Sequence, residues 1–571
     1  MVKFISSIGL ASLIIVSVNA CSGLSALAQL PEQPELPRSL VDTMPAEPSG
    51  RVIDVPAGDD FQAALNNAMP GDVIELEAGA VYEGPFTLPT KAGDEWIIIR
   101  SNATDDGLPG PGNRIDPGFA DLMPKLVSFS GSVVRTEAGA HHYRFEGVEM
   151  RPGRRGETNA GSIRRLRNLF AADGEGEFLY NIVELGSERQ SAEEVPHHII
   201  FDRCYIHGDP EKGSRRGIAI NSAYTAIIDS WLSDFKEVGA DSQAIAGWNG
   251  PGPFKIVNNY LEGAGENIIF GGADTSIAEL VPSDIEIRDN HFFKPLEWKT
   301  GHPDYAGTEW SVKNLFELKN ARRVLVDGNV FEHNWAHAQN GFSILFTVRN
   351  ERGRVPWAVV EDVTFSNNLL LSIGSGINIL GQDDNRYPSE PTRRLLIKNN
   401  VFADMGGPWG DGVLFQLLDG VENLTIDNNT AFNTGRIISA DGRPHRPFAL
   451  TDNIILHNTY GIVGSSTGRG NGTLFQYFPA ATVRGNVMVG APAESYPEEN
   501  HYPDGIDEVA FVAPEQGNYR LRADSPFRSE SGNGFGANVD ALCSALSGIE
   551  RTVFCQPERL SQRLADSAGS L

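Results

Sequence analysis

The chain has 571 residues, 40% of them apolar and 21% charged, and its formal net charge is −27. This composition is typical of a folded chain and excludes a largely disordered one. The acidic balance argues against nucleic acid as a partner, and an anionic polymer fits only where bound cations or a local Lys/Arg cluster offset the field. Four cysteines are too few for a disulfide framework, although Cys543 and Cys555 could close a small C-terminal loop.

The chain begins with an export signal. Lys3 precedes an apolar run at 8–18 that is too short for a membrane span, so we expect no transmembrane segment. Two processing routes stay open: ALA (26–28) fits a signal peptide of residues 1–28, and VNAC (18–21) fits a lipoprotein signal with lipid on Cys21. Both routes predict an exported protein, periplasmic or extracellular, and the second predicts an outer-membrane lipoprotein.

Two further elements precede the main body of the chain. Residues 29–50 are rich in Pro and Glu, which predicts a linker. Behind an N-cap at Asp59 or Asp60, helical spacing of apolar residues predicts a short amphipathic helix that contains Phe61, Ala64, Leu65 and Ala68. Such a helix is suited to cover the open end of a repetitive structure.

From residue 199 onward the chain repeats a short unit, an apolar run that ends in a polar residue and Asn or Asp. Examples are KIVNNYL (255–261), VTFSNNLL (363–370) and LLIKNNVF (395–402). The second polar residue falls at 203, 230, 259, 290, 329, 368, 400, 429, 453 and 486, in steps of 24–39 residues. One unit cannot bury its apolar face alone, so the units must stack. Asn suits each corner because it tolerates a left-handed backbone and because its amide can bond the Asn of the next coil.

These repeats and the opening segment 52–89 resemble the right-handed parallel β-helix of the pectin-lyase-like superfamily, which includes polysaccharide lyases and other carbohydrate-active proteins. The resemblance implies an all-β solenoid over residues 51–542 with a short N-terminal capping helix, closed by a coil at 517–542. Residues 543–571 are then a C-terminal tail. A polysaccharide partner and a monomeric protein are the corresponding expectations.

A second series of strands lies between the Asn corners, among them NIIFGGAD (267–274) and NLFELKN (314–320). In a stacked solenoid this series forms one parallel sheet, with equivalent positions about 4.8 Å apart from coil to coil. Acids and bases gather along it between residues 209 and 384. The two longest repeat steps hold the loops 302–310 and 349–357, which we expect to wall a groove.

Such a groove suits β-elimination on a uronate glycan, because the sugar carboxylate must be neutralised when C5 loses its proton. Lys319 is predicted to be the base and Arg349, one coil further, the charge-neutralising or acid group. His207 is a second candidate base, with a turn residue as the competing interpretation. Asp241, Glu266 and Asn267 are predicted to hold Ca²⁺ through oxygen ligands, since some Ca²⁺-dependent lyases of this fold are similar in using acids and Asn on neighbouring coils.

Aromatic rings, guanidinium groups and an amide are predicted to bind the sugar chain: Arg215, Arg216, Trp248, Asn249, Trp310 and Arg352. Two alternatives stay open. GQDD (381–384) resembles one element of polygalacturonases, which would make the protein an inverting glycoside hydrolase with paired carboxylates. A non-catalytic surface protein could bind glycans through the same groove. The sequence favours a secreted polysaccharide lyase.

Overall fold

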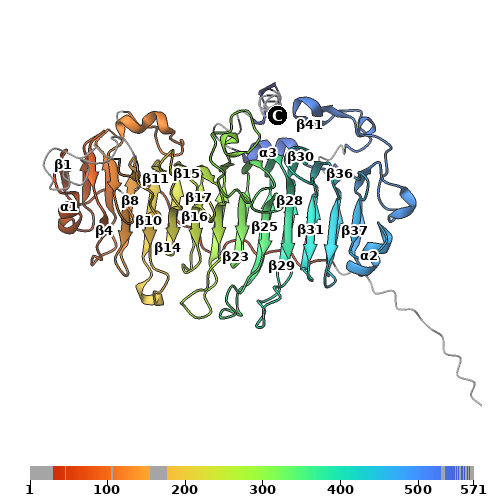
Figure 1. Ribbon diagram of the computed structural model, residues 1–571, viewed down its shortest axis with the longest axis horizontal. Helices are drawn as coiled ribbons and strands as arrows, with labels where there is room; N and C mark the ends of the chain where they lie inside the picture. The colour runs from red at the N-terminus through yellow and green to blue at the C-terminus, as the bar shows by residue number, and fades with distance from the viewer. Residues whose placement is uncertain are drawn as a thin grey trace, which may run out of the picture.

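The structure is a computed structural model that describes residues 30–45, 47–103, 107–154, 176–528, 534–546, 548, 551, 554–556, 558–559, 562 and 565. The predicted export signal, with Cys21, lies outside these residues. The described chain forms one elongated stack of coils from α1 (Phe61–Asn67) at one end to α2 (Asn471–Tyr477) at the other (Figure 1). None of the helices within the described ranges has the length and apolar character needed to cross a membrane.

A complete coil contributes one strand to each of three parallel sheets, called A, B and C in the order in which a coil visits them. Sheet A contains β1 (Val52–Val55), β2 (Val73–Leu76), β5 (Ile97–Ser101), β8 (His141–Glu146), β11 (His197–Asp202), β14 (Ala223–Ile228), β17 (Phe254–Val257), β20 (Ser283–Arg288), β23 (Ala321–Asp327), β26 (Val360–Ser366), β29 (Arg393–Lys398), β32 (Glu422–Asp427), β35 (Phe448–Thr451) and β38 (Thr482–Arg484). Sheet B contains β3 (Val81–Glu83), β6 (Lys125–Ser128), β9 (Glu149–Pro152), β12 (Tyr205–His207), β15 (Trp231–Phe235), β18 (Tyr260–Gly263), β21 (His291–Phe293), β24 (Val330–Asn334), β27 (Leu369–Ile373), β30 (Val401–Met405), β33 (Thr430–Asn433), β36 (Ile454–Leu456) and β39 (Val487–Val489). Sheet C contains β4 (Phe86–Leu88), β7 (Val134–Thr136), β10 (Asn181–Leu185), β13 (Arg216–Ile220), β16 (Gln243–Gly247), β19 (Glu266–Phe270), β22 (Phe316–Leu318), β25 (Phe342–Thr347), β28 (Ser375–Leu380), β31 (Phe415–Leu418), β34 (Ile438–Asp441) and β37 (Ile462–Gly464).

The core is a set of apolar columns inside the three sheets. In sheet C the register aligns Ile218, Ile245, Ile268, Phe316 and Ile344, all fully buried. Because strand side chains alternate between faces, every second residue of a strand points into the core and the residues between them face outward. The predicted fold class, a right-handed parallel β-helix, is confirmed. The capping helix is confirmed too, with Asp60 accepting a hydrogen bond from the N–H of Ala63 at 3.0 Å.

At the corner between sheets A and B, the two polar residues have separate roles. The first takes the left-handed conformation, as Asn258 does at φ 58°. The second points inward, and Nδ2 of Asn259 donates to Oδ1 of Asn290 at 3.0 Å. This ladder continues at 2.8–3.1 Å through Asn329, Asn368, Asn400, Asn429, Asn453, Asn486 and Asn500.

Asn329→Ala is expected to lower the free energy of unfolding by about 3 kcal/mol, measured by urea titration. The substitution removes Oδ1, which accepts from both the backbone N–H and the side-chain amide of Asn290 at 3.0 Å, and Nδ2, which donates to the Ile287 carbonyl. Asn471→Ala, on the exposed first turn of α2, is the control and should change stability by less than about 0.5 kcal/mol. Equal effects of the two substitutions would show that the ladder does not stabilise the fold.

The segment 30–45 lies along the outer face of sheet A, which differs from the predicted linker at 29–50. Val41 packs against Ile200, Ala226 and Ile228. The backbone N–H groups of Glu32, Glu35 and Arg38 donate to side chains of Asn423, Asp362 and Asp284 on three coils. A Pro-rich chain is extended, so its free N–H groups can follow a row of acceptors on a sheet.

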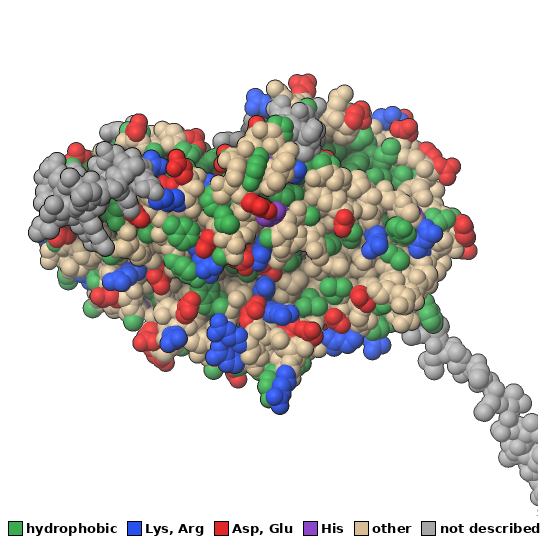
Figure 2. Space-filling model, in the orientation of Figure 1, with side chains coloured by type: hydrophobic (Ala, Val, Ile, Leu, Met, Phe, Trp, Pro, Cys, Tyr) green, Lys and Arg blue, Asp and Glu red, His purple; other side chains and the backbone are tan. Residues whose placement is uncertain are grey.

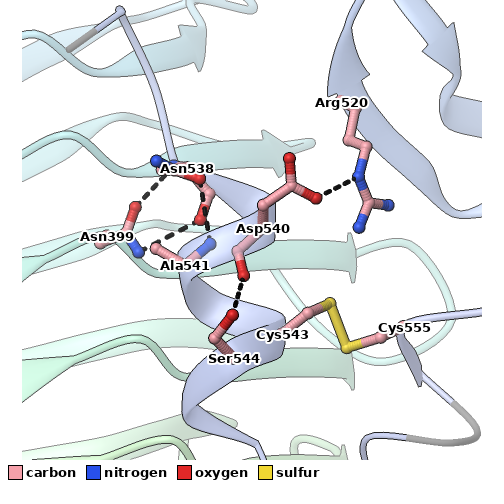
Figure 3. Close-up of a disulfide and its surroundings, with 8 residues drawn as sticks. All are labelled: Asn399, Arg520, Asn538, Asp540, Ala541, Cys543, Ser544 and Cys555. Atoms are coloured by element: carbon pink, nitrogen blue, oxygen red, sulfur yellow. Dashed lines mark hydrogen bonds and ion pairs between the residues drawn. A yellow bond between two sulfur atoms is a disulfide. The ribbon is translucent and has the colours of Figure 1, made fainter. Parts of the chain in front are cut away.

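The parallel strands end at β39, before the predicted boundary at 542. Beyond them β40 (Phe511–Ala513) and β41 (Asn518–Leu521) pair antiparallel, and α3 (Val539–Ala545) follows. Leu542 and Leu546 pack against Val330, Leu369 and other outward residues of sheet B. The described residues of segment 517–542 therefore lie over a side of the solenoid, and α2 closes its end through Leu474 and Tyr477. A disulfide joins Cys543 of α3 to Cys555, and Asp540 of the same helix pairs with Arg520 (Figure 3).

Candidate functional site

Sheet C is the second strand series predicted from the sequence, and it places Lys319 and Arg349 on consecutive coils. The backbone N–H of Arg349 donates to the carbonyl of Lys319 at 3.0 Å. Nζ of Lys319 lies 3.4 Å from Oε1 of Glu351 and 3.6 Å from Oε1 of Glu317. The Arg349 side chain is 41% exposed, with Nη1 3.9 Å from Oδ1 of Asp384. Two outward cationic groups thus occupy neighbouring positions above sheet C.

Glu317 lies buried beneath Lys319 and is held by two donors. Nδ2 of Asn314 donates to Oε2 of Glu317 at 3.1 Å, and Oγ1 of Thr347 donates to Oε1 at 3.2 Å. Burial works against the charged form of Lys319, but the carboxylates of Glu317 and Glu351 outweigh it and raise the pKa of Lys319. In the free protein Lys319 is therefore an ammonium group at neutral pH, and it must lose a proton before it can act as a base.

Glu351→Gln is expected to lower the pKa of Lys319, because it removes one of the three carboxylates that stabilise the ammonium form, the others being Glu317 and Glu266. The measurement is an NMR titration of isotopically labelled lysine side chains. Glu390→Gln is the control, since Glu390 is exposed and pairs with Arg393 instead. A pKa of Lys319 that is unchanged or higher in the Glu351 variant would contradict the electrostatic role of Glu351.

A second cluster, Asp241, Glu266 and Lys313, lies beside the first. Nζ of Lys313 is 2.6 Å from Oδ1 of Asp241 and 3.6 Å from Oε1 of Glu266. Nε2 of Gln243 donates to Glu266 at 2.7 Å, and Nε of Arg216 donates to Gln243 at 2.9 Å. Burial, together with the carboxylates of Glu317 and Asp241, raises the pKa of Glu266 to about 7. Glu266 is therefore partly protonated at neutral pH.

The three residues predicted to hold Ca²⁺ do not fit a calcium site as they are arranged. The ammonium of Lys313 contacts both Asp241 and Glu266. Asn267 is fully buried, and its Oδ1 accepts from Nζ of Lys294 at 3.1 Å while its Nδ2 donates to two backbone carbonyls. Calcium needs six to eight oxygen ligands, whereas Lys313 already supplies positive charge between these acids. Calcium binding at these residues stays a prediction, and removal of Ca²⁺ by a chelator tests it.

Guanidinium groups lie on aromatic rings toward the N-terminal end of sheet C. The Cζ atom of Arg216 is 5.0 Å from the ring centroid of Tyr180 and 5.3 Å from that of Trp248, and Cζ of Arg215 is 4.8 Å from Tyr180. A cavity of about 610 Å³ opens here, lined by Tyr180, Arg216, Trp248 and Asn221. Stacked rings and guanidinium groups suit the flat faces and carboxylates of an acidic sugar.

The charges around these groups are mixed in sign. In the face shown in Figure 2, acidic and basic side chains are interspersed across the middle of the solenoid, with no large area of one sign. Opposite charges hold one another in place, on adjacent coils for Lys319 and Glu351 and two coils apart for Lys313 and Asp241. The net charge of −27 therefore does not prevent local recognition of an anion.

His207 is not brought to this groove. It lies in β12 of sheet B and is buried, and its ring stacks on Tyr205. Its Nε2 lies 3.2 Å from Oε1 of Glu149, and its Nδ1 lies 2.7 Å from the carbonyl of Gly208. Both ring nitrogens have partners within sheet B and its following turn, so the structure separates His207 from Lys319 and Arg349.

Three residues predicted to bind sugar have other contacts. Asn249 is fully buried, donating to the carbonyl of Ser187 and accepting from the N–H of Ser276, both at 2.9 Å. Trp310 packs into a cluster of buried tryptophans with Trp298, Trp335 and Trp409. The side chain of Arg352 is exposed in the loop after β25, and its backbone N–H donates to Asp274. Of the residues predicted to bind sugar, Arg215, Arg216 and Trp248 lie close together, with both guanidinium groups on the ring of Tyr180 and Arg216 also on that of Trp248.

The carboxylates of GQDD do not form a catalytic pair. Asp383 is buried and accepts from the N–H groups of Asn350 at 2.6 Å and Asn385 at 3.1 Å, whereas Asp384 is 95% exposed. Oδ1 of Asp241 lies 2.6 Å from Nζ of Lys313, and Oε1 of Glu266 lies 3.6 Å from the same atom. These two oxygens are therefore no more than about 6.2 Å apart. This separation is shorter than the roughly 6.5–9.5 Å of an inverting glycosidase.

Tyr180 and Glu351 are site residues that sequence reasoning missed. Tyr180 precedes β10, whose sequence NIVEL has the same alternation as the later strands of sheet C. Extending that series by one coil would have found it. Glu351 lies in the predicted groove-wall loop 349–357, but nothing in the loop sequence indicates which of its charged residues turns toward Lys319.

Comparisons with known proteins support the fold alone. No protein-family model and no curated protein matches the sequence. Among solved structures, the family 6 polysaccharide lyase AlyGC, an alginate lyase, matches at 12% identity with a TM-score of 0.44, over 86% of this chain and 58% of that one. Pectate lyase Pel9A matches at 12% identity and 0.33, over 86% and 92%. PfbA, a surface adhesin of Streptococcus pneumoniae, matches at 12% and 0.39, over 71% and 86%.

The shared feature is the parallel β-helix, which the three parallel sheets of this chain define. The chain spans only 58% of the length of AlyGC. A fold alone does not define a function, which depends on the residues of the site.

Proposed function

We propose that the protein is a polysaccharide-processing enzyme, a β-eliminating lyase acting on an acidic, uronate-containing glycan in the groove over sheet C. The observation that carries this proposal is the position of Lys319 and Arg349 on consecutive coils, both directed outward beside carboxylates. Elimination needs a base and a fixed positive charge within the length of one sugar ring, and two coils about 4.8 Å apart supply that spacing.

The chemistry assigns one step to each cation. The guanidinium of Arg349 pairs with the uronate carboxylate and stabilises the negative charge that develops there when C5 loses its proton. Lys319, after its ammonium group has released a proton to solvent, takes the C5 proton, the C4–C5 double bond forms, and the bond from C4 to the glycosidic oxygen breaks. The departing oxygen takes up a proton, which the newly formed ammonium of Lys319 can return. No step requires a bound metal.

The cluster of Tyr180, Arg216 and Trp248 is proposed to bind a neighbouring sugar of the same chain. It lies on earlier coils of sheet C than Lys319, so a polymer that runs along the solenoid axis would reach both. Arg216 is connected to Glu266 through Gln243, which links the binding cluster to the acids beside Lys313. A chain of several sugars is thus a better fit than a monosaccharide.

The proposal is tested by incubating the mature protein with pectic, alginate, glucuronan and glycosaminoglycan polymers and following ultraviolet absorbance from the new C4–C5 double bond. We expect a rise with one class of uronate polymer that persists after chelation. Loss of the signal with chelator, restored by Ca²⁺, would support the calcium prediction and contradict the role given to Lys313. New reducing ends without absorbance would indicate a hydrolase, and tight binding without either product would indicate a non-catalytic glycan-binding protein.

Export is part of the same proposal. A polymer substrate lies outside the cytoplasm, which agrees with the signal predicted at residues 1–28 or the lipoprotein signal ending before Cys21. Cell fractionation of the full chain, with mass spectrometry of its mature N-terminus, distinguishes the two processing routes. A cytoplasmic, unprocessed protein would contradict both.

A further inference from the structure

Two pairs of adjacent histidines occupy the same place on consecutive coils of sheet A. His141 and His142 begin β8, His197 and His198 begin β11, and His197 is the register partner of His141. The rings of His141 and His197 are parallel with centroids 4.8 Å apart, and those of His142 and His198 are 4.5 Å apart. Within each pair the two Nδ1 atoms are 2.8 Å apart. No role for these two His-His pairs was predicted from the sequence.

The backbone explains why adjacent residues converge. Neighbouring side chains of a regular strand point to opposite faces. His142 and His198 instead have φ of 58° and 53°, in the left-handed region, and this break in alternation turns both rings of each pair to one side. The same conformation recurs at Tyr224 on the next coil, with φ 46°, so the fold supplies it regardless of the residue type. The histidines use an existing feature of sheet A.

The spacing of the nitrogens matches ligands on one ion. At a metal–nitrogen distance of about 2.0–2.1 Å, two nitrogens 2.8 Å apart subtend an angle near 90° at the metal. That angle belongs to square-planar or octahedral sites, which Cu²⁺ and Ni²⁺ favour, more than to the tetrahedral sites of Zn²⁺. The ligand nitrogens of His141, His142 and His197 all lie within 4.8 Å of one another.

We propose that His141, His142 and His197 form a binding site for one divalent transition-metal ion of the Cu²⁺ or Ni²⁺ type. His141 and His142 chelate through Nδ1, and His197 supplies the third nitrogen once its ring turns out of the parallel stack. A hydrogen bond between the two Nδ1 atoms of a pair holds one proton between them, and binding at His141 and His142 moves this proton to Nε2. The site is on sheet A and separate from the groove over sheet C.

The surroundings favour this ion. Trp96 packs edge-on against His142 and Tyr224 stacks on His198, which leaves the four rings half-buried and limits their motion. The order of divalent affinities places Cu²⁺ above Ni²⁺ and Zn²⁺ for nitrogen ligands.

The test is a titration of the untagged mature protein with copper sulfate, followed by calorimetry, electron paramagnetic resonance and thermal unfolding. We expect one Cu²⁺ per chain, nitrogen hyperfine coupling in the spectrum, and a higher Tm in the presence of the ion. His142→Tyr and His197→Gln are each expected to weaken binding at least tenfold. Tyrosine at 142 should preserve the fold because Tyr224 occupies the equivalent left-handed position.

His337→Gln is the control, because His337 lies in a loop on other coils and pairs with the exposed Glu309. It should leave affinity, spectrum and Tm shift unchanged. Binding of Cu²⁺ that is equally tight in the His142→Tyr and His197→Gln double variant would overturn the proposal. A spectrum without nitrogen coupling, or a stoichiometry above one ion, would overturn it as well.

Discussion

Lys319→Met is expected to lower kcat for glycan cleavage by about 1,000-fold, with little change in KM or Tm. Methionine keeps an unbranched apolar stem but cannot take the proton from C5. Glu317 retains its donors Asn314 and Thr347, so the buried carboxylate beneath the site stays satisfied. The measurement is the initial rate of ultraviolet absorbance at saturating polymer, with Tm recorded for each variant.

Two further variants separate the role of base from that of a positive charge. Lys319→Arg keeps the charge but has a pKa too high to release a proton, so it should be as inactive as the methionine variant. Lys398→Met removes a lysine paired with Asp427 on sheet A and should leave kcat unchanged. An arginine variant with near-parent activity would show that Lys319 acts as a charge, and the base would then have to be sought elsewhere in the groove.

Arg144→Met is expected to lower the free energy of unfolding by about 3 kcal/mol. Arg144 is 1% exposed and contacts Asp202 at 2.5 Å, Glu146 at 2.6 Å and the carbonyl of Thr43 at 3.1 Å. Removing it leaves buried carboxylates with fewer partners and removes one of the contacts that hold the N-terminal segment on sheet A. The estimate is at the lower end for a broken buried pair because Arg203 still contacts Asp202 at 2.8 Å.

The control for this prediction is Arg522→Met. Arg522 and Asp524 form an ion pair in which both side chains are more than half exposed. Such pairs contribute little because water screens them, so the change in unfolding free energy should stay below about 0.5 kcal/mol. If Arg144→Met were equally mild, the buried network under the N-terminal segment would not be a source of stability.

The solenoid could be predicted from sequence because its corner chemistry repeats. Asn259, Asn290 and the ladder residues through Asn486 stand at the predicted positions, since one residue type meets the same need on each of these coils. In the first copy the predicted ladder position, Arg203, is one residue too early. Arg203 has the left-handed conformation, and Cys204 takes the ladder position, where its backbone N–H donates to Oγ of Ser230. No Asn marks that corner, so the pattern gave no register there.

The N-terminal segment could not be predicted, because its partners are remote. The acceptors of Glu32, Glu35 and Arg38 lie 391, 327 and 246 residues away. They align only because the coils stack, and the local composition of Pro and Glu contains no sign of them. The same holds for the C-terminal segment, which was expected to continue the coils and instead covers sheet B.

The site was partly predictable for the same reason as the fold. Stacking turns sequence into columns, which correctly put Lys319 beside Arg349 and Asp241 near Glu266. The column alignment does not show which polar side chains are buried and hydrogen-bonded within the protein. Asn249 and Asn267 have the residue type of ligands, but both are fully buried with their amides bonded to neighbouring loops and coils. Trp310 likewise has the residue type of a sugar platform and packs inside a loop cluster.

The most direct test of the central claim is the fate of water oxygen during cleavage. The uronate polymer that gives ultraviolet absorbance is digested in ¹⁸O-labelled water, and the oligosaccharide products are analysed by mass spectrometry. An eliminating lyase with Lys319 as base breaks the bond without adding water, so the predicted products carry no label from cleavage and have an unsaturated end. Products with one labelled oxygen per cleaved bond and saturated ends would contradict the lyase and establish hydrolysis.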